Sequence, residues 1–192
     1  MHRPLPAAAM PAPAPGCLLV AEPPMPDPNF KRTVILLCEH NMEGSFGLVL
    51  NRPAGVKLSE VATVDLPFDA TLWHGGPVQP ETLHYLHPFG DAIPGAMPVL
   101  EGVYWGGEFD AVSDGLADGL LDPDRIRFFV GYSGWGPGQL DAEHDDGSWI
   151  VLDATPGVAF AEEDDELWRQ ILREMGGEYA LLANFPDDPR LN

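Results

Sequence analysis

A glycine-rich segment holds the residues whose types are most suggestive of chemistry. Residues 131–136 read Gly-Tyr-Ser-Gly-Trp-Gly, which places Ser133 next to glycine. A nucleophile elbow requires G-x-S-x-G, because its glycines let a strand turn sharply beneath an exposed serine. Trp135 stands where the last glycine of that motif is needed, and His144 is the only histidine after Ser133 that could complete a triad. The segment therefore predicts a strand end and a tight turn, not a serine hydrolase.

The same glycines do not form a phosphate-binding motif. A P-loop ends in Gly-Lys-Ser/Thr, and no lysine follows Gly136. A dinucleotide fingerprint needs G-x-G-x-x-G, and Gln139 occupies the position of its last glycine. The segment does lead into a helix predicted to begin near Gln139, and a helix N-terminus preceded by small residues can bind an anion. Ser133, Gly134 and Gly136 are therefore candidate ligand-binding residues, with a plain tight turn as the alternative.

Two other predicted turns carry polar residues or glycines. Asn51 and Arg52 close a predicted strand just before a proline, and His74, Gly75 and Gly76 follow another predicted strand. A lone arginine in an acidic chain can hold an anion or pair with a carboxylate. We include these five residues among the candidate ligand-binding residues.

Cys38 is the candidate for thiol chemistry. Cys38, Glu39 and His40 end a predicted strand, and residues two apart in a strand face the same side. The Cβ atoms of Cys38 and His40 are then expected about 6–7 Å apart, too far for the hydrogen bond of a catalytic Cys–His pair. A buried structural cysteine is the default interpretation, and a partly exposed, redox-sensitive thiol at a strand end is the functional candidate.

The six histidines do not predict a metal centre. His84 and His87 are three apart in a segment that favours a strand, where they would point to opposite sides. The H-E-x-x-H, C-x-x-C and EF-hand spacings do not occur. We therefore predict neither a metal nor a cofactor.

The charge of the chain limits the partners it can bind. Ten lysines and arginines stand against 30 aspartates and glutamates, giving a formal net charge of −20. A protein that binds duplex nucleic acid needs a cationic face, so direct binding is not expected. No run of about 18 apolar residues occurs, which argues against a membrane partner. Hydrophobic residues make up 45%, which is typical of a globular domain.

The first fifteen residues differ from the rest of the chain. Residues 1–15 contain five prolines, which prevent a helix and predict a disordered Pro/Ala-rich tail. These prolines also interrupt every stretch that could form the apolar core of a secretory signal. Two cysteines without a disulfide framework fit a reducing compartment. We therefore expect a cytoplasmic protein with a single domain over 16–192.

Short apolar runs separated by glycine and proline predict strands. They lie at 17–21, 33–38, 46–51, 71–74, 83–87, 102–105, 126–132 and 148–153. The run at 33–38 is continuously apolar and predicts a strand buried on both faces. Because strands outnumber helices and many links are short, we predict an α+β fold with a mixed, largely antiparallel sheet flanked by a few helices.

Few helices are expected, over 58–64, 110–121 and 164–175 and from about Gln139. Val112, Leu116 and Leu120 recur every four residues in 110–121 and predict a buried face. The segment 164–175 begins with acidic residues, and Gly176-Gly177 is expected to stop it. Its apolar face is predicted to comprise Leu167, Trp168, Ile171, Leu172 and Met175.

Taken in order, several long motifs resemble the YqgE/AlgH family of bacterial proteins. They read CLLVAEPPMPDPNFKRTVILLCEHNMEGSFGLVLNRP, LWHGGPVQPETLHYLH, GVYWGG, RFFVGYSGWGPGQLDAE and GSWIVLDATP, and the resemblance spans about residues 16–185. It implies a small cytosolic protein whose mixed sheet is bent partly into a barrel, with helices packed outside. A transcriptional-regulator label travels with the family, but the resemblance supplies no catalytic residues that could be carried over to this chain.

The leading hypothesis is a non-enzymatic binding or regulatory protein that acts through a protein partner, because the motifs contain no intact catalytic signature. The alternative is a small-molecule or nucleotide binder, or an undetected enzyme, that uses the glycine-rich turns. Direct regulation of transcription is the least favoured hypothesis, because the chain lacks a basic patch and a helix-turn-helix pattern.

Overall fold

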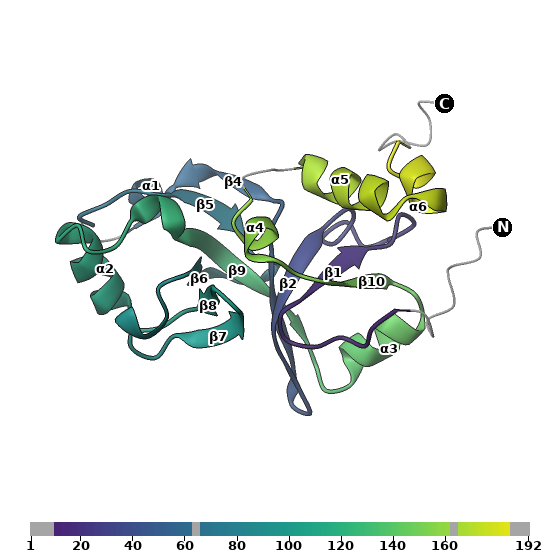
Figure 1. Ribbon diagram of the computed structural model, residues 1–192, viewed down its shortest axis with the longest axis horizontal. Helices are drawn as coiled ribbons and strands as arrows, with labels where there is room; N and C mark the ends of the chain where they lie inside the picture. The colour runs from purple at the N-terminus through teal and green to yellow at the C-terminus, as the bar shows by residue number, and fades with distance from the viewer. Residues whose placement is uncertain (1–9, 63–65, 162–164, 185–192) are drawn as a thin grey trace.

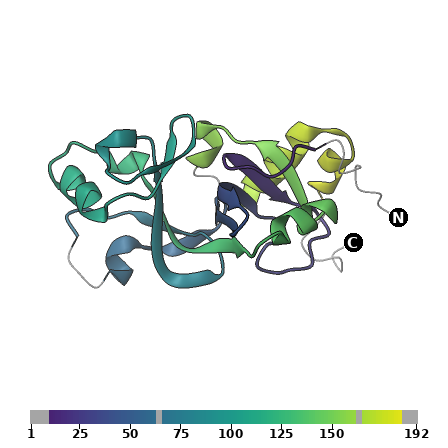
Figure 2. The same cartoon turned by 90° about the horizontal axis from the view of Figure 1, so that it is seen from below.

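A computed structural model of the protein describes residues 10–62, 66–161 and 165–184. Its strands form a single ten-stranded sheet, with helices around it (Figure 1). The molecule is elongated, with α2 near one end and the C-terminal helices near the other (Figure 2). Of the predicted tail, residues 1–9 lie outside the described residues. Pro13 is buried and Met10 packs against the main core.

The strands are short and their bounds follow the apolar runs. They are β1 (Cys17–Ala21), β2 (Val34–Asn41), β3 (Gly44–Val49), β4 (Pro53–Lys57), β5 (Thr71–His74), β6 (Val78–His87), β7 (Met97–Leu100), β8 (Val103–Trp105), β9 (Arg127–Trp135) and β10 (Trp149–Asp153). The helices are α1 (Leu58–Val61), α2 (Phe109–Ala117), α3 (Gln139–Asp145), α4 (Pro156–Ala159), α5 (Asp165–Met175) and α6 (Gly177–Leu182). Two 3-10 turns, η2 (Gly90–Ala92) and η3 (Pro123–Arg125), lie between them. In the described part of the chain, no helix is long and apolar enough to cross a membrane.

The sheet is mixed and largely antiparallel, which confirms the predicted fold class. Its strand order is β10-β1-β2-β3-β9-β6-β8-β7, with β4 attached through β5. The β5–β9 pair is parallel and the other pairs are antiparallel. Among the described residues, β10 and β7 end the order and do not pair with each other. The sheet is therefore open, and the partial bending into a barrel that the family resemblance implied does not lead to closure.

One strand, β9, belongs to both halves of this sheet. Its last residues, 133–135, pair with β3, whereas residues 128–130 pair with β5, and residues 127–130 together with Tyr132 pair with β6. Gly131 lies between the two paired stretches and has a φ of 67°, which a glycine adopts without strain. This bend lets one strand serve two differently oriented parts of the sheet.

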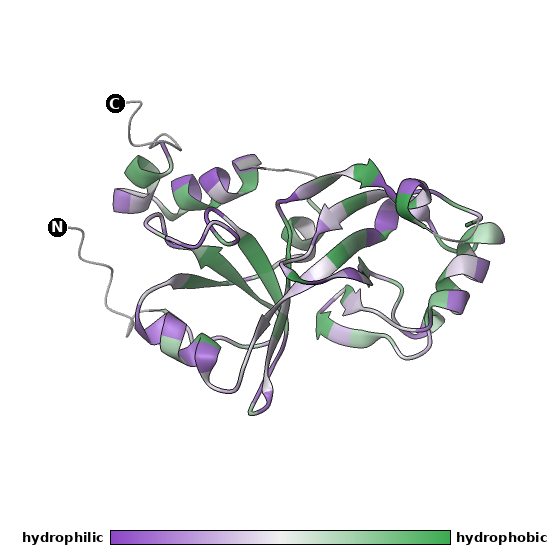
Figure 3. Ribbon diagram, turned by 180° about the vertical axis from the view of Figure 1, so that it is seen from behind, coloured by the Kyte–Doolittle hydropathy of each residue, from purple (hydrophilic) through white to green (hydrophobic). Residues whose placement is uncertain are grey.

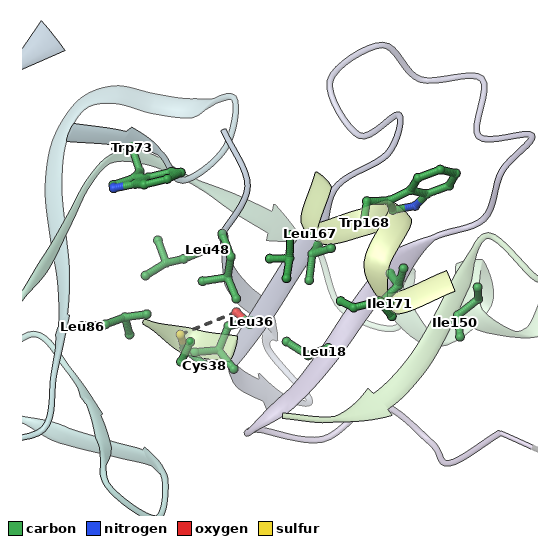
Figure 4. Close-up of a cluster of buried hydrophobic side chains, with 14 of the residues drawn as sticks. Leu18, Leu36, Cys38, Leu48, Trp73, Leu86, Ile150, Leu167, Trp168 and Ile171 are labelled. Carbon is green, nitrogen blue, oxygen red and sulfur yellow. Dashed lines mark hydrogen bonds between the residues drawn. The ribbon is translucent and has the colours of Figure 1, made fainter. Parts of the chain in front are cut away.

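The central strands are buried on both faces, as predicted for 33–38. Side chains of β1 and β2 alternate between two hydrophobic clusters, because successive residues of a strand point to opposite faces. Leu36 faces the larger cluster with α5, whereas Leu37 faces the smaller one with α3. Figure 4 shows part of the larger cluster, and in Figure 3 β1 and β2 are strongly hydrophobic. A third cluster lies beneath α2.

Several predicted elements end earlier, or divide differently, than expected. The helix predicted over 110–121 ends at Ala117, and Gly119 follows with a φ of 69°. Leu120 is therefore 79% exposed, and the prediction of a buried face through Leu120 is wrong. In the predicted helix 58–64, only Leu58–Val61 is helical, and 63–65 lie outside the described residues. The strands β4 and β7 and the helices α4 and α6 were not predicted.

The helix α5, predicted over 164–175, is the best-predicted helix. Leu167, Trp168, Ile171 and Leu172 are buried, and the Trp168 indole donates a hydrogen bond of 2.8 Å to the Ala21 carbonyl. The chain does break at Gly176, as predicted, but a short helix, α6, resumes at once. The break follows from Gly176 and Gly177, which both have positive φ.

A single carboxylate fastens α3 beneath the sheet. Glu143 Oε2 accepts hydrogen bonds from the indoles of Trp135 at 2.9 Å and Trp149 at 2.8 Å, while Oε1 accepts one from Gln139 at 2.9 Å. Phe30 stacks on Trp135 and meets Trp149 edge-on. These contacts give Trp135, Gln139 and Glu143 of the segment GWGPGQLDAE a structural role.

We expect Glu143→Ala to lower the free energy of unfolding by about 2–4 kcal/mol, because two buried indole N–H groups lose their acceptor. Glu143→Gln keeps one side-chain oxygen and should lose less. Urea unfolding measures both values, with Glu174→Ala on the exposed side of α5 as the control, expected within about 0.5 kcal/mol of wild type. If Glu143→Ala is as mild as the control, the carboxylate does not hold α3 in place.

Candidate functional site

The structure brings three of the predicted ligand-binding residues together at β9. The Gly75 N–H donates to the Val130 carbonyl at 2.9 Å, and its carbonyl accepts from Val49 N–H at 2.9 Å and Ser133 Oγ at 3.1 Å. A Cβ on Gly76 would lie 2.2 Å from the carbonyl carbon of Tyr132. Gly75, Gly76 and Ser133 thus form a junction in which backbone packs directly on backbone, with no room for a side chain at either glycine.

Ser133 is fully buried in this junction. Its hydroxyl donates to the Gly75 carbonyl, which fixes its orientation within the sheet. A nucleophile needs an exposed oxygen with a base in reach, and this hydroxyl is instead used in a structural contact.

Asn51 joins neighbouring loops rather than facing a cleft. It is fully buried, its Oδ1 accepts from Val34 N–H at 2.9 Å, and its Nδ2 donates to the Arg32 carbonyl at 2.8 Å. Arg52 Nη2 donates to the Lys31 carbonyl at 2.5 Å, and the Arg52 carbonyl accepts from His74 N–H at 2.8 Å. Arg52 and His74 are thus neighbours through their backbones, and His74 is exposed.

The two remaining candidate glycines lie farther along β9 and its turn. A Cβ on Gly134 would meet the Tyr132 ring at 3.0 Å, so this glycine makes room for the ring. The Gly136 N–H donates to Gln139 Oε1 at 3.0 Å, so the Gln139 side chain already occupies the N-terminal end of α3. Gly136 has open space around it, unlike the glycines of the junction.

Cys38 lies at a bulge of β2 and is 5% exposed. The register shifts there, so that Leu37 faces Gly47 while Glu39 faces Phe46. Cys38 consequently packs in the larger cluster, where its thiol contacts the Leu36 carbonyl at 3.7 Å (Figure 4). Burial raises the pKa of the thiol well above its usual range, which favours the protonated form.

His40 lies on the other side of the sheet from Cys38. Its Nδ1 is 2.8 Å from Ser45 Oγ, and its Nε2 is 3.4 Å from Asp141 Oδ1 on α3. The prediction that Cys38 and His40 share a face is wrong, because the bulge reverses the alternation between them.

Four aromatic side chains meet at one end of the larger cluster, and no sequence motif pointed to them. We call the set formed by Phe46, His84, Trp105 and Tyr132 the aromatic face. The Phe46 ring stacks on Trp105 at 4.3 Å and on Tyr132 at 4.8 Å, and His84 meets it edge-on at 5.1 Å. All four side chains are partly exposed.

The four residues of the aromatic face come from β3, β6, β8 and β9, which are not consecutive in the chain. Partial burial lowers the pKa of His84, whose Nε2 lies 3.0 Å from the Thr82 hydroxyl. The imidazole is therefore uncharged near pH 7. Only the strand order, which the sequence does not reveal, could have identified this set.

A pocket of about 520 Å³ lies at the other end of β9. Arg127 is 6% exposed, donates to the carbonyls of Ala159 at 3.1 Å and Leu50 at 2.5 Å, and holds its guanidinium 3.9 Å from the centre of the Trp73 ring. The residues that line the pocket are Pro53, Lys57, Asp69, Ala70, Thr71, Trp73, Pro123, Asp124, Ile126, Arg127 and Phe160. None of the residues predicted to bind a ligand lines it.

Comparison with known proteins assigns the chain to a family. A family model described as AlgH-like matches residues 18–180. The chain belongs to the AlgH-like family. This confirms the resemblance inferred from the motifs, and the matched span contains β9, the glycine junction, the aromatic face and the pocket.

Relatives and solved structures of the AlgH-like family cover nearly the whole chain. A UPF0301 protein of Chlorobium limicola is 46% identical over 178 residues, which are 93% of this chain and 95% of the relative. The solution structure of the AlgH protein from Pseudomonas aeruginosa matches with a TM-score of 0.71 at 31% identity, over 98% of this chain and 100% of that one. A crystal structure from Corynebacterium diphtheriae matches with a TM-score of 0.78 at 26% identity, over 96% and 100%.

The part of this AlgH-like chain that the structure describes offers no evident metal centre. Within residues 10–62, 66–161 and 165–184, no three His, Cys, Asp or Glu side chains gather closely enough to hold an ion.

We expect Cys38 to react with a thiol reagent only when β2 opens. Its burial and its raised pKa both oppose formation of a thiolate, which is the reactive species. In a Cys17→Ser background, the labelling rate by iodoacetamide should stay far below that of free cysteine between pH 7 and about pH 9, and rise on unfolding in urea. Fast labelling of the folded protein would instead support the redox-sensitive thiol that was the functional candidate from the sequence.

Proposed function

We propose that this member of the AlgH-like family is a cytoplasmic, non-enzymatic binding protein that acts through a protein partner. The observation that carries the proposal is the aromatic face, a stack of rings that remains partly exposed on the sheet. Aromatic side chains dominate the energy of protein interfaces because they bury large areas with few rotatable bonds.

The state of the nucleophile candidates supports a non-enzymatic role. Ser133 is fully buried and bound to the Gly75 carbonyl, and Cys38 is buried with a raised pKa. Cys17, the second cysteine, is also free and buried, which fits a reducing compartment. These side chains stabilise the fold and offer no exposed reactive atom.

The hairpin between β2 and β3 extends the aromatic face towards solvent. Met42 at its tip is 93% exposed, and the hairpin projects from the rest of the molecule (Figure 1). Methionine is common at binding surfaces because its flexible side chain adapts to different partners. Phe46 lies on the same hairpin, so Met42 and the aromatic rings can contact one partner together.

Charge favours a partner that is basic as well as apolar. Glu39 lies directly across from Phe46 in the β2–β3 register, Glu43 follows Met42, and the exposed Glu81 lies three residues before His84 on β6. With a formal net charge of −20, the chain attracts cationic surfaces and repels acidic ones. The same charge disfavours direct DNA binding, so a regulatory role would operate through such a protein.

We expect Met42→Ser combined with Glu39→Gln to weaken partner binding without unfolding the protein. Tagged wild type, this double variant and Leu120→Ser are each incubated with lysate of the source cells at about 0.15 M salt. Leu120→Ser is the matched control, because Leu120 is 79% exposed on a different surface. Each captured protein is then purified and its affinity measured directly by titration.

The proposal predicts at least one basic protein that binds wild type and Leu120→Ser equally and the double variant at least about tenfold more weakly. Equal affinity for all three would place the interface elsewhere. Absence of any direct binder would remove the case for a protein partner.

A further inference from the structure

We propose that the pocket beside Arg127 binds a small zwitterion, an amino acid or short peptide with an apolar side chain. The pocket lies on residues that the aromatic face does not use, so this inference is independent of the protein-partner proposal. Its volume of about 520 Å³ is within the range typical of small-molecule sites.

Rigid elements build the walls of the pocket. Arg127 is held by carbonyls from two other segments, at Leu50 and Ala159, and lies over the Trp73 ring. Trp73 is on β5, which pairs with β9, so the guanidinium and the indole keep a fixed relation. A preorganised wall of this kind lowers the entropy cost of binding.

The apolar part of the pocket fits a hydrocarbon or aromatic side chain. Trp73, Ile126 and Phe160 line it together with Pro53 and Pro123. None of these five side chains carries a formal charge, and burial of a ligand's apolar group against them removes water from both surfaces.

Charged groups of both signs line the same pocket in equal number. Arg127 and Lys57 supply two positive charges, and Asp69 and Asp124 supply two negative ones. In the whole chain, acidic residues outnumber basic ones by 30 to 10, so this parity is local to the pocket. A purely anionic or cationic ligand would meet as much repulsion as attraction, whereas a zwitterion can place each of its charges near an opposite one.

The rim of the pocket shows which charges are best placed for the ligand. Lys57 Nζ is 3.7 Å from Asp69 Oδ2, and Asp69 Oδ1 also accepts from the N–H groups of Ser59 and Ala70. Asp69 is thereby committed to its own loop, and the hydrogen bond from the Ser59 N–H, more than the contacts with Ala70 and Lys57, holds the pKa of Asp69 below the usual range. Asp124, exposed on η3, is therefore the carboxylate assigned to the ligand's ammonium group. Lys57, whose side chain is 64% exposed, is assigned to the ligand's carboxylate, with Arg127 as a fixed positive charge in the pocket wall.

The test uses three forms of one dipeptide that differ only in charge. Leucyl-leucine has both terminal charges, its N-acetyl form lacks the ammonium, and its C-terminal amide lacks the carboxylate. Each is titrated into the full chain by calorimetry, while the indole N–H resonance of Trp73 is followed by NMR. We expect the free dipeptide to bind and to shift that resonance, and each blocked form to bind at least about tenfold more weakly.

Two exposed residues allow the charges to be assigned without disturbing Arg127, which holds several elements together. Asp124→Asn should remove the preference for a free ammonium group, and Lys57→Gln should reduce the preference for a free carboxylate. Asp118→Asn, which removes an exposed charge outside the pocket, is the matched control and should leave binding unchanged. The thermal unfolding midpoint of each variant shows whether it is folded.

Three results would overturn the proposal. The first is that the blocked dipeptides bind as tightly as the free one, and the second is that the Trp73 resonance does not respond to the dipeptide. The third is that no form binds at concentrations on the order of 10 mM. If the pocket has no affinity for the dipeptide, the proposal of a protein partner at the aromatic face is unaffected. The two proposals can therefore fail separately.

Discussion

The close approach of the Gly75–Gly76 backbone to β9 is the constraint on which the rest of the structure depends. A Cβ on Gly75 would lie 2.3 Å from the Gly131 carbonyl oxygen, and one on Gly76 would lie 2.2 Å from the Tyr132 carbonyl carbon. Real Cβ atoms do not approach backbone so closely, and Gly76 and Gly131 also have positive φ. Glycine at these positions lets β9 bend while it stays paired with β3, β5 and β6.

The features of functional interest are placed along this one strand. Arg127 at its start forms a wall of the pocket, Tyr132 near its middle belongs to the aromatic face, and Trp135 at its end donates a hydrogen bond to the Glu143 carboxylate of α3. The spacing along β9 therefore fixes how far the pocket lies from the aromatic face. The glycine-rich motif that first suggested catalysis acts here mainly to shape the strand that positions both.

The sequence predicted the strands well where apolar runs were long. The run 33–38 was correctly predicted to be buried on both faces, and the burial of Leu167 and Trp168 followed from helical periodicity. Prediction from the sequence failed where the pairing of strands decides the position of a residue or the existence of a strand. The bulge at Cys38 reversed the side on which His40 lies, and the edge strand β4, with few buried residues, gave no periodic signal.

The candidate sites, like the strands, could be predicted from the sequence only in part. Asn51, Gly75, Gly76 and Ser133 are candidate ligand-binding residues in the sequence, but the structure uses them in contacts within the fold, and the sequence could not distinguish a ligand contact from a backbone contact. The aromatic face and the pocket were missed for a different reason. Each is assembled from strands or loops far apart in the chain, and no short-range pattern records which of them are neighbours.

The most direct test of this account compares Gly76→Ala with Gly136→Ala in urea unfolding. Both glycines belong to motifs that suggested a ligand site, yet only Gly76 faces backbone at 2.2 Å, whereas a Cβ on Gly136 would meet no atom closer than 3.9 Å. We predict that Gly76→Ala lowers the free energy of unfolding by at least about 3 kcal/mol or prevents folding. Gly136→Ala should leave it within about 0.5 kcal/mol of wild type. Equal and small effects would contradict the claim that the glycine junction determines the path of β9.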